Sequence, residues 1–319
     1  MSTITKLDNL KSYVESEGLI NVNRIDSVDL GELVSVDIGR WQSYEPYHSQ
    51  EQLLLQLENL RTLPIRNAYG CIRFIYSKVI EAYEKYIEEA VPKINIESTE
   101  IVLETEVYYT SKIEGANTTR KRTQQIHNGS PIQENNAFSE AMVKGNFEAV
   151  KLLNVFGNTI TKDKLLKVWQ VLTEGCRDNE EIQGDEYRVG EVTVIGSPFI
   201  AVAVGELDTV MEDFISFYND VLLDEHPFLK AAIIHYAFET IHPFCDGNGR
   251  LGRLLMNNYL IKQGIESARA VSFSMEIDKN RGLYDYAFNA SENDNGDCTP
   301  FLEYMLERMA NAYYTVLQV

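Results

Sequence analysis

The chain has 319 residues, enough for one large domain or for a domain with an extension. Its formal net charge is -19, and so acidic a surface repels nucleic acid and anionic membranes. Four dispersed cysteines exclude a disulfide framework and a zinc ribbon, so a cytoplasmic location is expected. No signal peptide and no membrane-spanning helix are expected either, because no suitable apolar run occurs.

The N-terminal part of the sequence predicts a helical extension. Residues 1–50 mix short apolar pieces with Asp, Gly and Ser and predict no clear element. The spacing of apolar residues then predicts helices at 52–62 and 69–90, which Pro64 separates. We therefore expect residues 1–100 to form a mostly helical extension, with dimerisation and target choice as its candidate roles.

The rest of the chain predicts a mainly α protein with one β-hairpin. Apolar residues on both sides of Gly196-Ser197-Pro198 predict the hairpin at 191–204. A helix at 97–109 runs on towards Gly115, which can end it. Further helices are predicted at 139–156, 161–176, 207–223, 227–242 and 250–263, with two more near the C-terminus.

The strongest functional signal is the segment His242–Arg253, which has the sequence HPFCDGNGRLGR. Its glycines permit a tight turn, and the helix that starts near Gly249 directs free N–H groups and a positive dipole end at that turn. Such a turn binds anions. Arg250 and Arg253 share a face of this helix, and Asn257 continues it. Two fixed cations beside an anion site favour a polyphosphate as the bound ligand.

Two further side chains complete this predicted site. Asp246 would repel phosphate unless a cation bridges them, and Mg²⁺ combines few protein carboxylates with several phosphate oxygens. His242 lies at the edge of the same turn, where an imidazole can take a proton from a hydroxyl group near neutral pH. The residues therefore favour in-line attack on a bound phosphorus atom.

The segment His242–Arg253 matches the Fic family motif, H-P-F-x-[DE]-G-N-G-R-x-x-R, at every defined position. The resemblance extends from about residue 100 to the C-terminus. It implies a Fic-type helical bundle at 101–319, with a hairpin flap at about 188–204. At this flap the extended segment of a protein target would dock against Val192, Thr193, Val194 and Ile195.

The same resemblance implies the chemistry. His242 would deprotonate a Ser, Thr or Tyr hydroxyl, and Asp246 would hold Mg²⁺. The residues implied to bind ATP are Gly247, Asn248, Gly249, Arg250 and Arg253, to which the helix face adds Asn257. Related Doc-type kinases carry Lys in place of Gly249, so Gly249 favours transfer of AMP to a protein, which includes the chain itself as a target. A homodimer is expected from the resemblance alone.

The segment Thr110–Gly115 fits the inhibitory signature of the family, [ST]-x-x-x-E-[GN]. The resemblance implies an inhibitory helix at about 101–115, which begins with the apolar spacing noted above and ends in the signature with Thr110 and Glu114. Glu114 would pair with Arg253 and take the place of the terminal phosphate. The predicted enzyme is therefore an autoinhibited protein adenylyltransferase.

Several alternatives stay open. The same pocket could remove AMP from a modified protein, with Glu114 orienting water, or the chain could be a non-catalytic nucleotide-binding regulatory module. His235, Glu239 and His242 share a helical face that would suit a zinc hydrolase, although their order is not H-E-x-x-H. Cys245 as a nucleophile is a weaker alternative, and Arg188 is a candidate helper of the site.

Overall fold

The computed structural model describes residues 59–96, 99–157, 159–177, 186–193, 199–220, 225–293 and 297–318. The elements are β1 (Leu60–Asn67), β2 (Gly70–Ile75), α4 (Lys78–Ala90), α5 (Thr99–Ile113), α6 (Arg120–His127), α7 (Ala137–Val155), α8 (Lys162–Thr173), α9 (Leu207–Asn219), α10 (Pro227–Ile241), α11 (Asn248–Lys262), α12 (Phe273–Lys279), α13 (Arg281–Asn293) and α14 (Thr299–Leu317). The predicted mainly α fold is confirmed.

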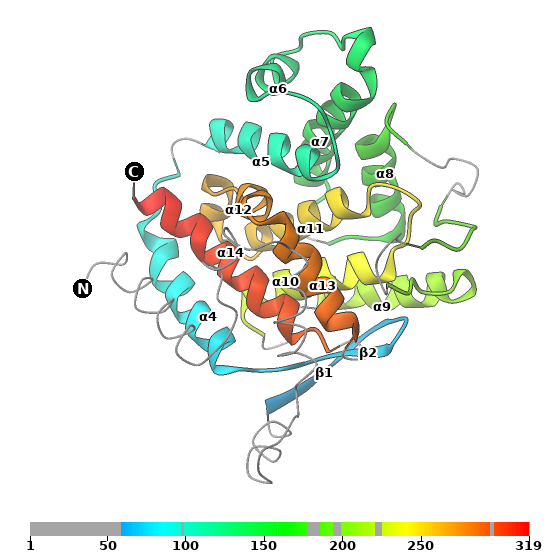
Figure 1. Ribbon diagram of the computed structural model, residues 1–319, viewed down its shortest axis with the longest axis vertical. Helices are drawn as coiled ribbons and strands as arrows, with labels where there is room; N and C mark the ends of the chain where they lie inside the picture. Colours follow the sequence, from blue (N-terminus) through cyan, green and yellow to red (C-terminus); the bar gives the residue numbers. More distant parts are fainter. Residues whose placement is uncertain are drawn as a thin grey trace.

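Helices α10 and α11 form the centre of the molecule (Figure 1). Every residue of α10 from Phe228 to Phe238 is buried, as expected of a helix that is apolar on all sides. Pro227 occupies its first turn, where a missing N–H costs nothing. The predicted helices at 227–242 and 250–263 are thus confirmed within two residues at each end.

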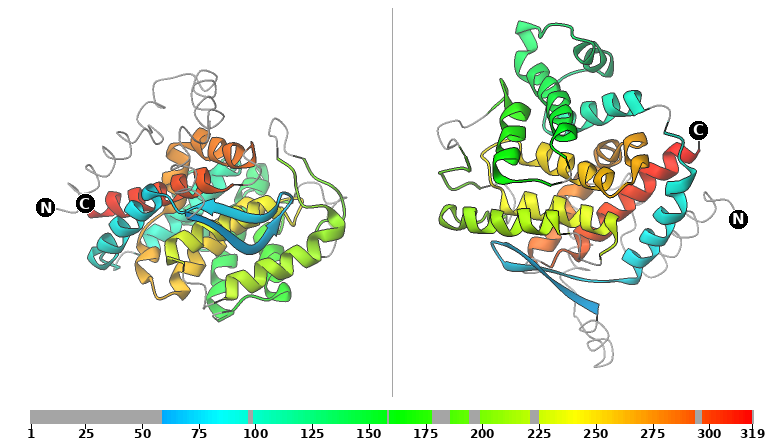
Figure 2. Two further views of the ribbon diagram at one scale, coloured as in Figure 1. Left: turned by 90° about the horizontal axis from the view of Figure 1, so that it is seen from below. Right: turned by 180° about the vertical axis from the view of Figure 1, so that it is seen from behind.

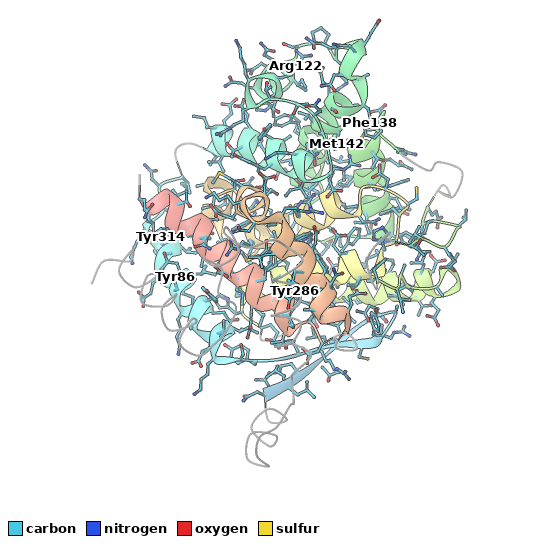
Figure 3. All side chains as sticks on the ribbon, viewed as in Figure 1. Tyr86, Arg122, Phe138, Met142, Tyr286 and Tyr314 are labelled. Carbon is cyan, nitrogen blue, oxygen red and sulfur yellow. The ribbon has the colours of Figure 1, made fainter. Side chains whose placement is uncertain are left out.

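Other elements surround this pair on several sides. Helix α4 lies alongside α14, as Figure 1 and the rear view in Figure 2 both show. Helices α5, α6 and α7 gather at one end of the molecule, marked by Arg122 and Met142 in Figure 3, while Tyr286 marks α13. The short 3-10 helix Glu266–Ala270 follows α11. The predicted helices at 139–156, 161–176 and 207–223 correspond to α7, α8 and α9, and Thr161 caps α8 by accepting a hydrogen bond from Lys164 N.

The predicted helix at 69–90 is wrong over its first part, which forms an antiparallel hairpin. β1 pairs with β2 through a turn between Asn67 and Gly70, and the φ of Gly70 is 102°. Ile72 and Phe74 are fully buried while Cys71 and Arg73 between them are exposed, so the burial alternates with the period of a strand. The apolar residues 72, 75, 76 and 79 suited a helix only because the end of β2 and the start of α4 follow each other closely.

The hairpin predicted at 191–204 is not found in the residues described on either side of its turn. Residues 191–193 and 199–203 form no strand, and a 3-10 helix covers Val204–Glu206. Val194 and Ile195 lie outside the described residues, as does most of the predicted helix at 52–62. The hairpin of the described structure is therefore β1–β2, which lies before the expected flap in the chain.

Helix α5 is held against the rest of the molecule by polar contacts along its length. Glu106 accepts hydrogen bonds from Ser272 Oγ at 2.7 Å and from Ser274 N at 3.0 Å, both at the start of α12. Lys112 pairs with Asp278 at 2.7 Å. Gly115, with a φ of 86°, ends the helical segment as predicted. These contacts place the last turn of α5 beside α11.

Candidate functional site

The turn between α10 and α11 is defined by two residues with left-handed backbone conformations. His242 has a φ of 54° and ends α10, and Gly247 has a φ of 83° and precedes α11. A left-handed conformation is uncommon for a residue with a side chain and costs free energy, so the surrounding structure must hold His242 in place. The turn brings the His242 ring and the N-terminus of α11 to the same side.

Hydrogen bonds within the turn fix its shape. The Asn248 side chain donates to Phe244 O at 2.7 Å and accepts from Phe244 N at 3.1 Å. Trp169, on α8, donates from Nε1 to Asp246 O at 3.0 Å and stacks on Phe244 at 4.4 Å between ring centroids. The side chain of Asn248 therefore closes the turn, while its backbone begins α11.

His242 has the hydrogen bonding of a neutral base. Its Nδ1 lies 3.2 Å from Glu239 O, and because a carbonyl only accepts, Nδ1 carries the hydrogen and Nε2 carries the lone pair. Burial lowers the pKa of His242 to about 4, and nearby Arg188 also lowers it. The imidazole is therefore unprotonated at neutral pH.

Arg188 supports the backbone of the turn through two hydrogen bonds. Its guanidinium is buried, with 1% of the residue exposed, and Nε donates to His242 O at 2.8 Å. Its backbone N donates to Pro243 O at 2.9 Å. Arg188 thus holds the strained backbone at His242 and leaves the imidazole free to face the cavity.

Asp246 and Arg250 form an ion pair at the start of α11. Arg250 Nη2 lies 3.1 Å from Asp246 Oδ2, and Gly247 N donates to Asp246 Oδ1 at 2.6 Å. Arg250 is buried and donates further to Leu172 O and to the Cys176 sulfur at 3.4 Å and 3.2 Å. Asp246 stays partly exposed, with 21% of its side chain accessible. The pair places one positive and one negative group at the anion site.

Arg253 is held by two residues of the predicted inhibitory segment. Its Nη2 lies 2.7 Å from Glu114 Oε1, and its Nε donates to Thr110 Oγ1 at 2.9 Å. Burial would raise the pKa of Glu114, but the Arg253 guanidinium outweighs it and the pKa lies below its ordinary value. Arg253 Nη1 is buried and has no hydrogen-bond partner among the described residues. One nitrogen of this guanidinium is therefore unused within the described residues.

Gly249 allows Glu114 to approach the start of α11. A Cβ atom on Gly249 would overlap Glu114 Oε1, and it would lie 3.1 Å from Arg253 Nη1. Any side chain at this position would therefore push Glu114 away from the helix. The unused Nη1 also faces this N-terminus, so Glu114 and Arg253 meet at the predicted phosphate site.

A cavity of about 560 Å³ opens beside these groups. The turn, α10 and α13 supply most of its walls. Of the predicted residues, the structure brings His242, Asp246, Gly247, Asn248, Gly249 and Glu114 to this cavity. Asn257 is not brought there. With Thr110, Arg250 and Arg253 it lines a second cavity, between α5, α7 and α11. Val192 and Thr193 lie outside any strand and are not among the described residues that line the cavity.

Sequence reasoning missed the contribution of α13, about 40 residues after His242. Arg281, Tyr284 and Asp285 line the cavity, and no sequence motif links them to the turn. Glu239 was assigned only to the zinc alternative, but it also faces this cavity. Burial and the neighbouring Glu114 raise its pKa to about 8. Its position one helical turn before His242 is the signal that could have identified it.

The zinc alternative does not fit the geometry. His235 is fully buried in the core, and its Nε2 lies 2.8 Å from Tyr284 OH. Within the described residues, no group of three or more His, Cys, Asp or Glu side chains could hold a metal ion. Among the same residues, no helix is both long enough and apolar enough to cross a membrane.

Residues 159–260 match the model of the Fic/DOC family. This segment is a Fic domain. The matched Fic domain includes α8 to α10 and nearly all of α11, with the whole turn and both arginines. Helix α5 and Glu114 lie outside the matched residues, so the pairing of Glu114 with Arg253 comes from the structure itself.

The Fic domain has relatives among animal proteins. The chain is 30% identical over 225 residues to protein adenylyltransferase Fic of Nematostella vectensis, a match that covers 65% of this chain and 48% of that protein. The protein of the same name from Aedes aegypti is 29% identical over 211 residues, which cover 63% of this chain and 39% of that protein. The chain thus spans less than half the length of these relatives.

Solved structures share the fold. A Fic family protein from Desulfovibrio desulfuricans G20 superposes with a TM-score of 0.68 at 20% identity, over 77% of this chain and 76% of that chain. Fic-1 from C. elegans superposes with a TM-score of 0.61 at 20% identity, over 75% of this chain and 72% of that chain. The expected Fic-type architecture is confirmed.

Proposed function

We propose that the chain transfers AMP from ATP to a Ser, Thr or Tyr hydroxyl group of a protein, and that Glu114 restrains this activity. The observation that carries the proposal is the position of His242. Its neutral imidazole faces the cavity beside the N-terminus of α11, with Nδ1–H held by Glu239 O and Nε2 left to accept a proton. The relatives named protein adenylyltransferase Fic support the same reaction.

The triphosphate would lie at the start of α11. The first N–H groups of a helix and its dipole attract anions, and Arg250 adds a buried cation there. The hydroxyl oxygen attacks the α-phosphorus, the bond from that phosphorus to the β-phosphate oxygen breaks, and pyrophosphate leaves. His242 Nε2 takes the hydroxyl proton.

Asp246 is the residue that would hold Mg²⁺. It is a single, partly exposed carboxylate beside the phosphate site, which suits an ion that takes most of its ligands from phosphate and water. When bound, the ion would neutralise negative charge on the phosphates. Within the protein, the contact between Asp246 and Arg250 keeps the carboxylate oriented towards the cavity.

The restraint follows from competition for Arg253. A terminal phosphate would need its guanidinium, and Glu114 already occupies Nη2 at 2.7 Å. The unused Nη1 is a buried donor that a phosphate oxygen would satisfy. With Glu114 in place, the γ-phosphate is displaced and the α-phosphorus lies out of line with the attacking hydroxyl.

The protein target would enter beside the turn and the described residues on either side of 194–198. Val189 and Ile200 on the two sides of this segment are 65% and 57% exposed, which suits contact with a partner. Phe199 lies 5.3 Å from His242 between ring centroids. An extended target segment paired along Val192, Thr193, Val194 and Ile195 would bring its hydroxyl to His242.

Removal of AMP is the second candidate, and the position of Glu114 favours it. Its carboxylate lines the same cavity as His242, where it could orient a water molecule towards a phosphodiester. In this reaction Glu114→Gly lowers the rate instead of raising it. Release of AMP from an AMP-modified protein by the parent chain and the variant distinguishes the two directions.

The decisive experiment compares the parent, Glu114→Gly, and Glu114→Gly with His242→Ala, each incubated with ATP labelled at the α or the γ position. We expect protein labelling from the α position, strongest in Glu114→Gly and absent in the double variant. Labelling from the γ position alone would mean a kinase. Equal labelling of parent and Glu114→Gly would reject the restraint.

A further inference from the structure

The second cavity, of about 350 Å³, lies behind the inhibitory contact. It is formed between the inward face of α5, the end of α7 and the face of α11 that carries Asn257. Its apolar lining comes from Val102, Leu103 and Val107 on α5, Val150 and Leu153 on α7, and Leu254 and Ile261 on α11. Its volume lies within the range of small-molecule sites.

Most of the charged groups at this cavity already have partners. Arg253 binds Glu114 and Thr110, Arg250 binds Asp246, and the carboxylate of Glu106 binds two serines of α12. His127 and Arg269 pair with Glu104 and Glu266. Glu100 lies exposed in the first turn of α5. Two buried guanidinium nitrogens, Arg250 Nε and Arg253 Nη1, have no partner among the described residues, but Nη1 lies beside Gly249 at the first cavity. An ion in the second cavity would therefore lose its hydration while most of its possible partners are already paired.

Amide groups supply the polar part of the lining. Both amide hydrogens of Asn146 are used, by Ser111 Oγ at 3.1 Å and Met142 O at 2.9 Å, so its side chain offers only its carbonyl oxygen. The half-buried Asn257 side chain makes no hydrogen bond within the described part of the chain. It can both donate and accept. A ligand group with one donor and one acceptor would match this pair.

We infer that this cavity binds an uncharged, mostly apolar small molecule that carries an amide-like group, and that the bound molecule strengthens the inhibitory contact. The cavity has its shape when α5 is attached to α11 through Thr110, Glu114 and Arg253. A molecule that fits this shape binds the restrained state better than a state in which α5 has moved, and it shifts the population accordingly. This coupling rests on the proposed function, whereas the binding does not.

Three probes with the same ring test the ligand class: benzamide is neutral, benzoate is an anion and benzamidine is a cation. Binding is followed by NMR of labelled Val and Leu methyl groups, including Val107 and Leu254. We expect benzamide to shift these methyl signals with a Kd on the order of 1 mM, as for a small fragment. Benzoate and benzamidine should bind at least about tenfold more weakly. Equal or tighter binding of either ion overturns the assignment.

Two variants test where benzamide binds and whether Asn257 contacts its amide group. Leu254→Trp fills the cavity from α11 and should abolish the benzamide shifts. Asn257→Leu keeps the size of the side chain and should weaken benzamide by about tenfold while toluene binds as before. Unchanged benzamide binding in Asn257→Leu overturns the proposal, and this milder variant answers the question even where Leu254→Trp does not fold.

The coupling is tested by labelling with α-labelled ATP. Saturating benzamide should lower transfer by the parent by about fivefold and leave Glu114→Gly unchanged, because that variant has no contact to strengthen. Equal inhibition of both proteins would place the effect at the ATP site and reject the coupling. If neither protein transfers AMP, the proposed function fails while the methyl shifts still report on the cavity.

Discussion

The turn at 242–248 and the last turn of α5 meet at the start of α11, yet they are held there by different means. The turn is fixed by buried contacts: Asn248 bonds the backbone of Phe244 in both directions, and Trp169 bonds Asp246 O and stacks on Phe244. The end of α5 depends on Thr110 and on Glu114, whose side chain is 25% exposed.

This difference assigns separate tasks to the two regions. A base and an anion site must keep their geometry through every reaction, and buried, satisfied hydrogen bonds provide that. A restraint must come off at a modest cost, and a partly exposed carboxylate can exchange its arginine partner for water while phosphate takes its place on Arg253. Four changes, taken from the largest expected effect to the smallest, test this comparison.

Removal of the base should have the largest effect. In the Glu114→Gly background, His242→Ala should lower AMP transfer by about 10³-fold, because a general base contributes that order of rate enhancement. Initial rates of labelling with α-labelled ATP measure it. His226→Ala is the matched control, because its ring bonds Glu88 outside the cavity. Comparable rates in His242→Ala and the control would remove His242 from the mechanism.

Removal of the Glu114 restraint should have the second-largest effect. Glu114→Gly should raise transfer by about 10- to 100-fold, the usual range of a coupling free energy, and Glu114→Gln should raise it less because it keeps a hydrogen-bond acceptor. Glu100→Gln, on the exposed first turn of α5, is the control for lost charge and should leave the rate unchanged. An equal increase in Glu100→Gln would attribute the effect to net charge.

Glu239, which lies between the two regions, should make stability depend on pH. Its pKa of about 8 lies above the ordinary 4.5, so the folded protein holds this proton where the unfolded chain has lost it. The free energy of unfolding should therefore fall as pH rises from about 4.5 to about 8. Glu239→Gln should remove this slope and stabilise the protein by on the order of 2 kcal/mol at pH 9. Urea unfolding of both proteins at pH 6 and pH 9 measures it, and parallel slopes would contradict it.

The smallest change tests the rigidity of the turn. Trp169→Phe keeps an aromatic ring against Phe244 but removes the hydrogen bond to Asp246 O, which should lower the free energy of unfolding by about 1 kcal/mol. Transfer in the Glu114→Gly background should fall several-fold with little change in ATP affinity. Thermal unfolding measures the change in stability, and labelling rates measure the change in transfer. A change in ATP affinity alone would mean that the turn serves binding more than chemistry.

The central part of the site follows from short-range features of the sequence. Gly247 and Gly249 allow the turn and the close approach of an anion, and the spacing of Arg250 and Arg253 places both on one face of α11. These are properties of the backbone and of helical periodicity, which act over a few residues. Helices such as α10 were predictable for the same reason, because their apolar residues are dense and continuous.

The distant residues that join that segment depend on how the helices pack. The segment 70–75 became a strand because pairing with β1 and burial of Ile72 and Phe74 outweighed an ambiguous local pattern. Gly249 lines the first cavity, whereas Arg253 and Asn257, one and two turns further along the same face of α11, line the second. Contacts of α11 with α5 and α13 depend on packing over long sequence separations, and local propensity carries no information about them.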